Sequence, residues 1–129
     1  MTEQQFKIEA TENVKQIINY ISKNEYENLL NITSIHESWC DEGEGQADGL
    51  ANFVEWLEGQ LELWKEDYEK EFVIDAFEEE QLDIMHFEGQ RGFANYEPQS
   101  FGEPLEFWFE IEFMIDENDK LTSQFHVNF

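Results

Sequence analysis

The stretch LEFWFEIEFMID, residues 105–116, alternates apolar and mostly charged side chains along its whole length. A period of two is typical of a β-strand that has one buried face and one solvent-exposed face. The apolar set comprises Leu105, Phe107, Phe109, Ile111, Phe113 and Ile115. The opposite set comprises Glu106, Trp108, Glu110, Glu112 and Met114. We therefore expect a sheet with one wholly apolar face on which other elements pack.

A period of two also appears elsewhere in the C-terminal half of the chain. It predicts further strands over residues 71–77, 81–89, 90–98 and 120–129. Gly89 marks a turn between two of these segments, and the acidic stretch 116–119 marks a tight turn before the last. The second half of the chain should therefore form four or five antiparallel strands.

Helical periodicity dominates the N-terminal half. Apolar residues that recur with the period of an α-helix predict a helix over residues 3–22, and Thr2 and Gln5 have the spacing of a capping box. A shorter helix is expected over residues 25–31. Residues 32–39 begin with β-branched side chains, which leaves open whether a short strand forms there.

A long amphipathic helix is predicted over residues 49–68, after a flexible loop of Gly and acidic residues at 41–49. Asp48 has the side chain of a helix N-cap. The helices must pack on the apolar face of the sheet, so the fold class is α+β with N-terminal helices on a curved, mainly antiparallel sheet. A curved sheet around helices tends to leave a cavity, whose mouth is a natural ligand site.

Composition limits the class of partner. The chain has 129 residues, which we interpret as one domain over 1–129, and its 31 Asp and Glu against 7 Lys and Arg give a net charge of −24. Such a surface repels nucleic acids and anionic lipids and attracts basic proteins or cations. Negative charge can also simply keep an aromatic-rich chain soluble.

Sequence features favour a cytoplasmic protein. Cys40 is the sole cysteine, so the chain has no internal disulfide, and the N-terminus lacks the basic and apolar regions of a signal peptide. No stretch approaches the roughly 20 apolar residues of a membrane helix. No cofactor-binding motif is present, and neither membrane nor nucleic-acid binding is expected.

Three segments resemble the nuclear transport factor 2-like superfamily, and in particular its SnoaL-like members. YISKNEYENLLNITS (20–34) is similar to that family's first-helix exit and short second helix. Asp48-Gly49 before LANFVEWLEGQLELW (50–64) is similar to its long-helix entry, and DENDKLTSQFHVNF (116–129) to its terminal hairpin. The region of the family's first strand departs from the pattern, because here it is short, polar and acidic.

The resemblance implies a cone-shaped α+β fold with a pocket between helices and sheet, and frequent dimerisation through the outer sheet face. It does not imply one activity, because members include isomerases, dehydratases, cyclases and domains without catalysis.

Few polar residues interrupt the apolar pattern in a way that suggests chemistry. His86, His126 and Asp75 are the candidates for acid–base catalysis, and the plain alternative is that each is an ordinary surface or edge residue. His36 and Cys40 have a spacing that suits one helical face, but a zinc site needs two further ligands at recognisable spacing. We therefore predict no metal site.

Aromatic residues supply the remaining candidates. The pocket-lining set is Phe53, Trp64, Phe107, Phe109 and Phe113, and the same rings can equally form plain core. The interface set is Trp56, Trp108 and Glu110. Trp56 lies beside the main apolar stripe of its helix, and Trp108 is a large aromatic on a face rich in Glu, which suits an anchor for a dimer or a basic partner.

Three functions remain open at this point. The first is a non-catalytic domain that binds a small apolar ligand or another protein, with a pocket between helices and sheet. The second is a small isomerase, dehydratase or cyclase that acts on an apolar substrate. The third is an acidic immunity-type protein that blocks a basic toxin.

Overall fold

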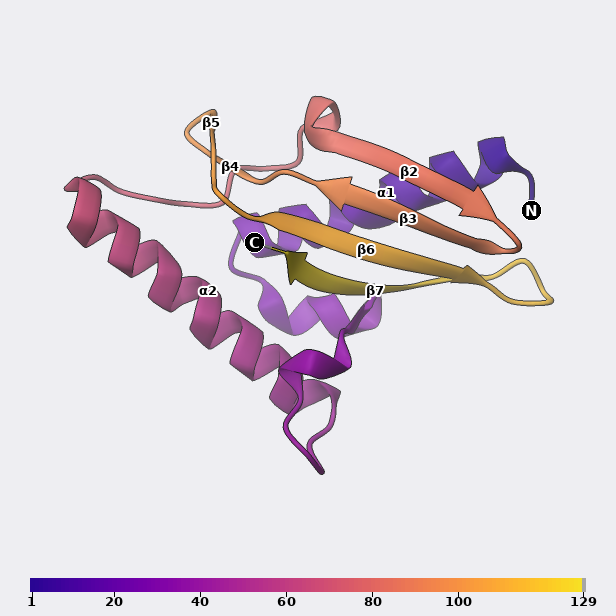
Figure 1. Cartoon of the computed structure of the whole chain (residues 1–129), viewed down its shortest axis with the longest axis horizontal. Coiled ribbons are helices and arrows are strands. Elements are labelled where there is room, and N and C mark those ends of the chain that lie inside the picture. The colour runs from indigo at the N-terminus through magenta and orange to yellow at the C-terminus, as the bar shows by residue number, and fades with distance from the viewer. Residues whose placement is uncertain (129) are drawn as a thin grey trace.

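A computed structural model describes residues 1–128, except for the side chain of His86. Two long α-helices pack against a mainly antiparallel sheet of five strands (Figure 1). The helices and 3₁₀ turns are α1 (Glu3–Ser22), η1 (Tyr26–Asn31), η2 (Glu37–Trp39), α2 (Gln46–Tyr68) and η3 (Glu79–Gln81). The strands are β1 (Ser34–Ile35), β2 (Leu82–Glu88), β3 (Arg91–Tyr96), β4 (Gln99–Ser100), β5 (Glu103–Pro104), β6 (Trp108–Ile115) and β7 (Leu121–Asn128). The predicted α+β class is thereby confirmed.

The large sheet has the order β1–β7–β6–β3–β2. The short strand β1 runs parallel to β7, and all other neighbours are antiparallel. β4 and β5 form a separate two-stranded hairpin. The open question about residues 32–39 is therefore resolved: a two-residue strand forms there and is followed by a 3₁₀ turn.

Helix α1 has the predicted bounds and the predicted cap. Thr2 Oγ1 accepts a hydrogen bond from the Gln5 amide at 3.1 Å, and Gln5 Oε1 accepts one from the Thr2 amide at 3.1 Å. The helix buries a stripe toward the sheet: Phe6, Ala10, Val14, Ile17, Ile18 and Ile21. These positions recur at the helical period, which is why the boundary could be placed from sequence.

Helix α2 begins at Gln46, three residues before its predicted start. Gly45 is the N-cap residue, and Asp48 lies in the first turn, where its Oδ2 accepts a 3.5 Å hydrogen bond from the Gly45 amide. Asp48 was wrongly predicted as the cap itself. An acidic side chain in the first turn still stabilises the helix, because it faces the positive end of the helix dipole.

Aromatic rings fill the space between α2 and the sheet. The Phe53 ring meets Phe125 at a centroid distance of 5.1 Å and Phe109 at 6.2 Å, both edge to face. Phe107 meets Phe109 at 5.3 Å in the same geometry. Edge-to-face contacts let the electron-poor edge of one ring meet the electron-rich face of another, so these rings form a packed core.

The strand predicted over residues 71–77 does not form. The segment makes isolated hydrogen bonds instead of a ladder: the Asp75 amide donates to the Gln99 carbonyl at 2.8 Å, the Val73 amide to Ser100 Oγ at 2.9 Å, and the Phe77 amide to Asn19 Oδ1 at 2.9 Å. Its neighbour β4 is two residues long and turns away into β5. A ladder needs a partner of matching length, so alternation alone was not enough.

Candidate functional site

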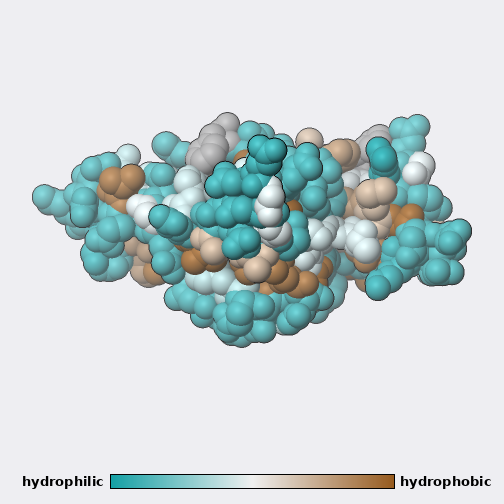
Figure 2. Space-filling model, turned by 90° about the horizontal axis from the view of Figure 1, so that it is seen from below, coloured by the Kyte–Doolittle hydropathy of each residue, from teal (hydrophilic) through white to brown (hydrophobic). Residues whose placement is uncertain are grey.

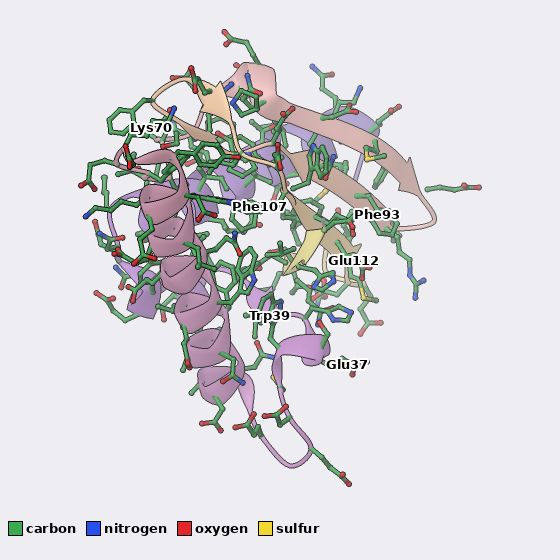
Figure 3. All side chains as sticks on the ribbon, turned by 60° about the vertical axis from the view of Figure 1, so that its left-hand side comes forward. Glu37, Trp39, Lys70, Phe93, Phe107 and Glu112 are labelled. Atoms are coloured by element: carbon green, nitrogen blue, oxygen red, sulfur yellow. The ribbon has the colours of Figure 1, made fainter. Side chains whose placement is uncertain are left out.

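The outer face of the large sheet carries no helix. We define the outer face as the face of the sheet that points away from α1 and α2. Phe93 on β3 and Glu112 on β6 lie opposite each other on this face. Figure 3 shows those two side chains on one side of the sheet, and Phe107 and Trp39 on the other side, toward α2. One row across this face comprises Asp83, Asn95, Glu110 and His126, and the next comprises Phe93, Glu112 and Gln124.

Large apolar side chains are exposed on this outer face. Trp108 is 36% exposed, Phe93 42% and Met114 55%. Met85, at the bulge of the edge strand β2, is 63% exposed. By contrast, β6 residues on the inner face, such as Phe109 and Ile111, are fully buried. Exposed apolar groups that gather on one sheet face make that face a candidate surface for a partner.

Carboxylates lie between these apolar groups. Trp108, Glu110, Glu112 and Met114 follow one another on the same face of β6, with about 7 Å between successive side chains. Asn128 Nδ2 donates to Glu110 Oε1 at 2.9 Å. In the described part of the chain, neither Lys nor Arg forms an ion pair with Asp83, Glu110 or Glu112. These carboxylates are therefore available to a cationic partner.

Asn95 adds an unused acceptor to the same row. Its Oδ1 is buried and has no hydrogen-bond partner among the described residues. In register it lies between Asp83 on β2 and Glu110 on β6. Two carboxylates, Asp83 and Glu110, therefore flank Asn95 across three strands and are accessible, whereas the Asn95 oxygen is buried beneath them. A guanidinium group, which carries only donors, suits the two carboxylates.

A histidine pair borders the outer face where β1 meets β7. The rings of His36 and His126 have a centroid distance of 4.6 Å. The Ser38 amide donates to His36 Nδ1 at 3.0 Å, and Ser38 Oγ lies 3.4 Å from His126 Nδ1. Partial burial, followed by the proximity of His36, lowers the pKa of His126, while Glu110 and Glu112 oppose that shift. The neutral form of His126 is therefore favoured.

The three candidates for acid–base catalysis lie in different parts of the fold. His126 is on the outer face of β7, and Asp75 binds the hairpin formed by β4 and β5. His86 pairs with Phe93 in the β2–β3 ladder, but its side chain lies outside the described residues. His126 contacts His36 and Ser38 instead. No local sequence pattern links these residues, because Ser38 and His126 are 88 positions apart.

The predicted pocket residues divide into two groups. Phe53, Phe107, Phe109 and Phe113 are at most 1% exposed and belong to the packed core. Trp64 is half-buried and lines a surface groove of about 160 Å³ at the C-terminal end of α2. Another cleft, of about 260 Å³, lies between α1, α2 and the segment after α2, and its lining mixes polar and apolar residues.

The predicted interface residues are also separated. Trp108 and Glu110 share the outer face. Trp56 lies on α2, half-buried against the rings of Trp39 and Phe107 at 5.7 and 5.4 Å. It therefore belongs to the aromatic layer between α2 and the sheet rather than to the face that carries Trp108.

Comparison with known proteins gives no relative from which to transfer a function. No protein-family model matches the chain, and neither a curated protein nor a solved structure is significantly similar to it.

None of the helices within residues 1–128 combines the length and apolar character that crossing a bilayer requires. Within the same residues, no three His, Cys, Asp or Glu side chains are grouped in a way that could hold a metal ion. Cys40 instead donates its S–H to the Gly45 carbonyl at 3.4 Å, beside the start of α2.

Proposed function

We propose that this chain is an interaction domain that binds a basic protein through the outer face of its sheet. The observation that carries the proposal is the alternation of exposed apolar side chains, Trp108 and Met114, with the carboxylates of Glu110 and Glu112 along one strand. Apolar anchors supply contact area that leaves water, and the carboxylates select for positive charge.

The net charge of −24 supports a positively charged partner. The surface shown in Figure 2 is mostly hydrophilic, with hydrophobic residues in small separate groups. A second copy of the chain would bring Glu110 and Glu112 against the same carboxylates in a two-fold interface, where like charges repel. A basic partner would gain Coulomb attraction from the same groups, so it is the occupant that we favour over the homodimer.

The packed core argues against a small ligand inside the fold. The side chains of Phe53, Phe107 and Phe109 are at most 1% exposed, and the Phe109 ring contacts the other two rings directly. An enzyme of the isomerase, dehydratase or cyclase type needs a convergent set of acid–base groups, and the candidates lie in separate places. The interaction function therefore has stronger support than either of these.

An acidic immunity-type protein is the more specific form of the same proposal. In that case the basic partner is a toxin, and the carboxylates of Asp83 and Glu110 receive arginine or lysine side chains from it. Likeness to the cone-shaped nuclear transport factor 2-like fold also remains a proposal, supported by the order of elements along the chain. A toxin gene next to the gene for this chain would support the immunity function.

Site-directed photo-crosslinking tests the proposal. A photoreactive amino acid at Phe93, on the outer face, is compared with one at Glu55, on the exposed side of α2. We expect the photoreactive amino acid at position 93 to crosslink a protein with a pI above about 9. This crosslink should disappear when Glu110 and Glu112 are both changed to Lys. Glu55→Lys combined with Glu62→Lys changes the charge equally and should leave capture intact.

Three outcomes contradict the proposal. Capture of a second copy of this chain from Phe93 would identify a homodimer instead. Equal capture from Glu55 and Phe93 would show that net charge acts without a defined face. Capture that persists at 1 M salt and in the Glu110 and Glu112 double variant would remove the electrostatic argument.

A further inference from the structure

The hairpin between β4 and β5 has an unexpected residue at its tip. Phe101 has a φ of +50° and Gly102 a φ of +80°. Two-residue turns with positive φ at both central positions normally carry Asn or Gly at the first, because a bulky side chain is strained there. Phe101 is nevertheless 69% exposed, so its ring does not gain enough burial to account for its presence.

Asp75 holds this tip in place. Its Oδ1 accepts from the Phe101 amide and its Oδ2 from the Gly102 amide, both at 2.8 Å. The Asp75 amide in turn donates to the Gln99 carbonyl at 2.8 Å. One carboxylate thus satisfies both turn amides and fixes an exposed aromatic ring in a strained conformation. Strain that is held by dedicated contacts points to a functional role.

Further aromatic side chains lie beside the tip. Trp64 and Tyr68 lie at the C-terminal end of α2, and Phe72 follows shortly after the helix. The centroid of the Phe72 ring lies 5.8 Å from that of Trp64 and 5.8 Å from that of Tyr68. Tyr68 is 63% exposed. Two adjoining cavities of about 160 and 290 Å³ share Phe72 and Leu105 in their lining, and Phe101 lines the larger one. We call this surface the aromatic groove.

The contacts of Lys70 indicate that the aromatic groove suits a cationic group. Its Nζ lies 5.4 Å from the centroid of the Phe72 ring and 3.3 Å from Glu103 Oε2. Lys70 therefore combines a cation–π contact with an ion pair, and Figure 3 shows it at the end of α2. Glu71 and Glu106 also line the two cavities. Glu71 pairs with Lys65 at 3.1 Å, so three carboxylates, Glu71, Glu103 and Glu106, stand against the two cations Lys65 and Lys70.

We propose that the aromatic groove binds an arginine of an extended peptide segment, together with an apolar residue next to it, and that Lys70 occupies the place of that arginine in the free chain. A planar guanidinium stacks on aromatic rings and can pair with Glu103 through two parallel hydrogen bonds in one plane, a geometry that an ammonium lacks. The apolar neighbour of the arginine contacts Phe101. This site lies away from the outer face and does not depend on the function proposed for that face.

An NMR titration with a defined probe tests the inference. The probe is the peptide acetyl-Leu-Arg-Leu-amide, and the control is the same peptide with citrulline, which has nearly the shape of arginine and no charge. We expect saturable shifts of the ring resonances of Trp64, Tyr68 and Phe72 with the arginine peptide. The citrulline peptide should bind at least tenfold more weakly.

Variants separate the aromatic groove from general charge attraction. Lys70→Gln should tighten binding of the arginine peptide at least threefold, because it removes the internal competitor. Lys7→Gln removes the same charge from the other end of the molecule, on α1, and should change binding less than 1.5-fold. Phe101→Asn should weaken binding at least threefold without loss of stability, because Asn is favoured at that turn position.

Several results would overturn the inference. Equal affinity for the arginine and citrulline peptides would exclude recognition of the charge. Equal effects of Lys70→Gln and Lys7→Gln would show only general electrostatics. Shifts confined to Trp108 and Phe93 would place the peptide on the outer face, which would leave the proposed function intact and remove the aromatic groove as a site.

Discussion

The ring of Phe6 lies against Gly92 so closely that a Cβ atom on residue 92 would overlap it. This contact joins the first turns of α1 to the start of β3. Phe6 also stacks on Phe87 at a centroid distance of 4.7 Å and meets Phe113 edge to face at 5.5 Å. The ring is therefore held on three sides and cannot move to make room.

Gly92→Ala should destabilise the fold by about 1–3 kcal/mol, the usual cost of overpacking a close-packed core. The added methyl group must push Phe6 away from its two aromatic neighbours. Urea denaturation followed by circular dichroism measures the effect as a fall in the transition midpoint. An unchanged midpoint would contradict the close contact.

Gly59→Ala provides the matched control. Gly59 lies inside α2, and a Cβ atom there meets no atom within 4 Å. The substitution should stabilise the chain by about 0.5–1 kcal/mol, because Ala loses less backbone entropy than Gly in a helix. The same chemical change should therefore have opposite signs at residues 59 and 92.

Much of this fold could be predicted from local patterns. The bounds of α1 and the buried face of β6 were predicted correctly because each depends on a periodicity within one element. The same alternation placed Trp108 and Glu110 together on the outer face. Those predictions needed no knowledge of which strands pair.

The parts that sequence analysis missed depend on distant residues. Ser38 and His126 are 88 positions apart and meet only because β1 pairs with β7 in parallel. Asp75 was interpreted as a weak catalytic candidate, but its carboxylate binds amides 26 and 27 positions away. The Phe-Gly pair at 101–102 was the available signal, since Gly after a polar strand end indicates a turn.

Asp75→Ala should destabilise the hairpin of β4 and β5. Both turn amides lose a charged acceptor, and because they are exposed, water replaces part of each bond, so a loss of about 1–2 kcal/mol is expected. Amide hydrogen exchange should accelerate at Phe101 and Gly102 and remain slow at β6. Asp75→Asn should show an intermediate effect, because only one amide oxygen remains to accept. Unchanged exchange at the tip in Asp75→Ala would show that the turn does not need the carboxylate.

Stability should depend on pH through His126. Its pKa in the folded chain is lowered, first by burial and then by His36, against the opposing effect of Glu110 and Glu112. The unfolded chain then binds the proton more readily than the folded chain, so stability rises with pH between the folded pKa and the ordinary value of about 6.5.

Thermal melts of the wild type and His126→Gln at pH values from about 5 to 8 test this dependence. The stability of the wild type relative to the variant should be lower at pH 5 than at pH 8. The comparison between the two proteins is needed because the many carboxylates begin to protonate near the lower end of that range. A difference that stays constant across the range, or one that grows toward low pH, would contradict the lowered pKa.

The net charge should make the chain more stable in salt. With a formal charge of −24, carboxylates repel one another over the whole surface, including Glu55, Glu58 and Glu62 along the exposed side of α2. Like charges three or four residues apart on a helix cost about 0.2–0.5 kcal/mol per pair at low salt. Raising the ionic strength from 0.01 to 0.15 M shortens the Debye length from about 30 to about 8 Å and weakens these repulsions.

We therefore expect the melting temperature to rise between 0.01 and 0.15 M sodium chloride. Replacing Glu58 by Gln should reduce the salt dependence, because it removes the carboxylate that repels both Glu55 and Glu62. Glu3 pairs with Lys7 at 3.8 Å, so Glu3→Gln removes an attraction instead and should not reduce the salt dependence. A melting temperature that falls with added salt would mean that ion pairs such as Lys65–Glu71, at 3.1 Å, outweigh the repulsion.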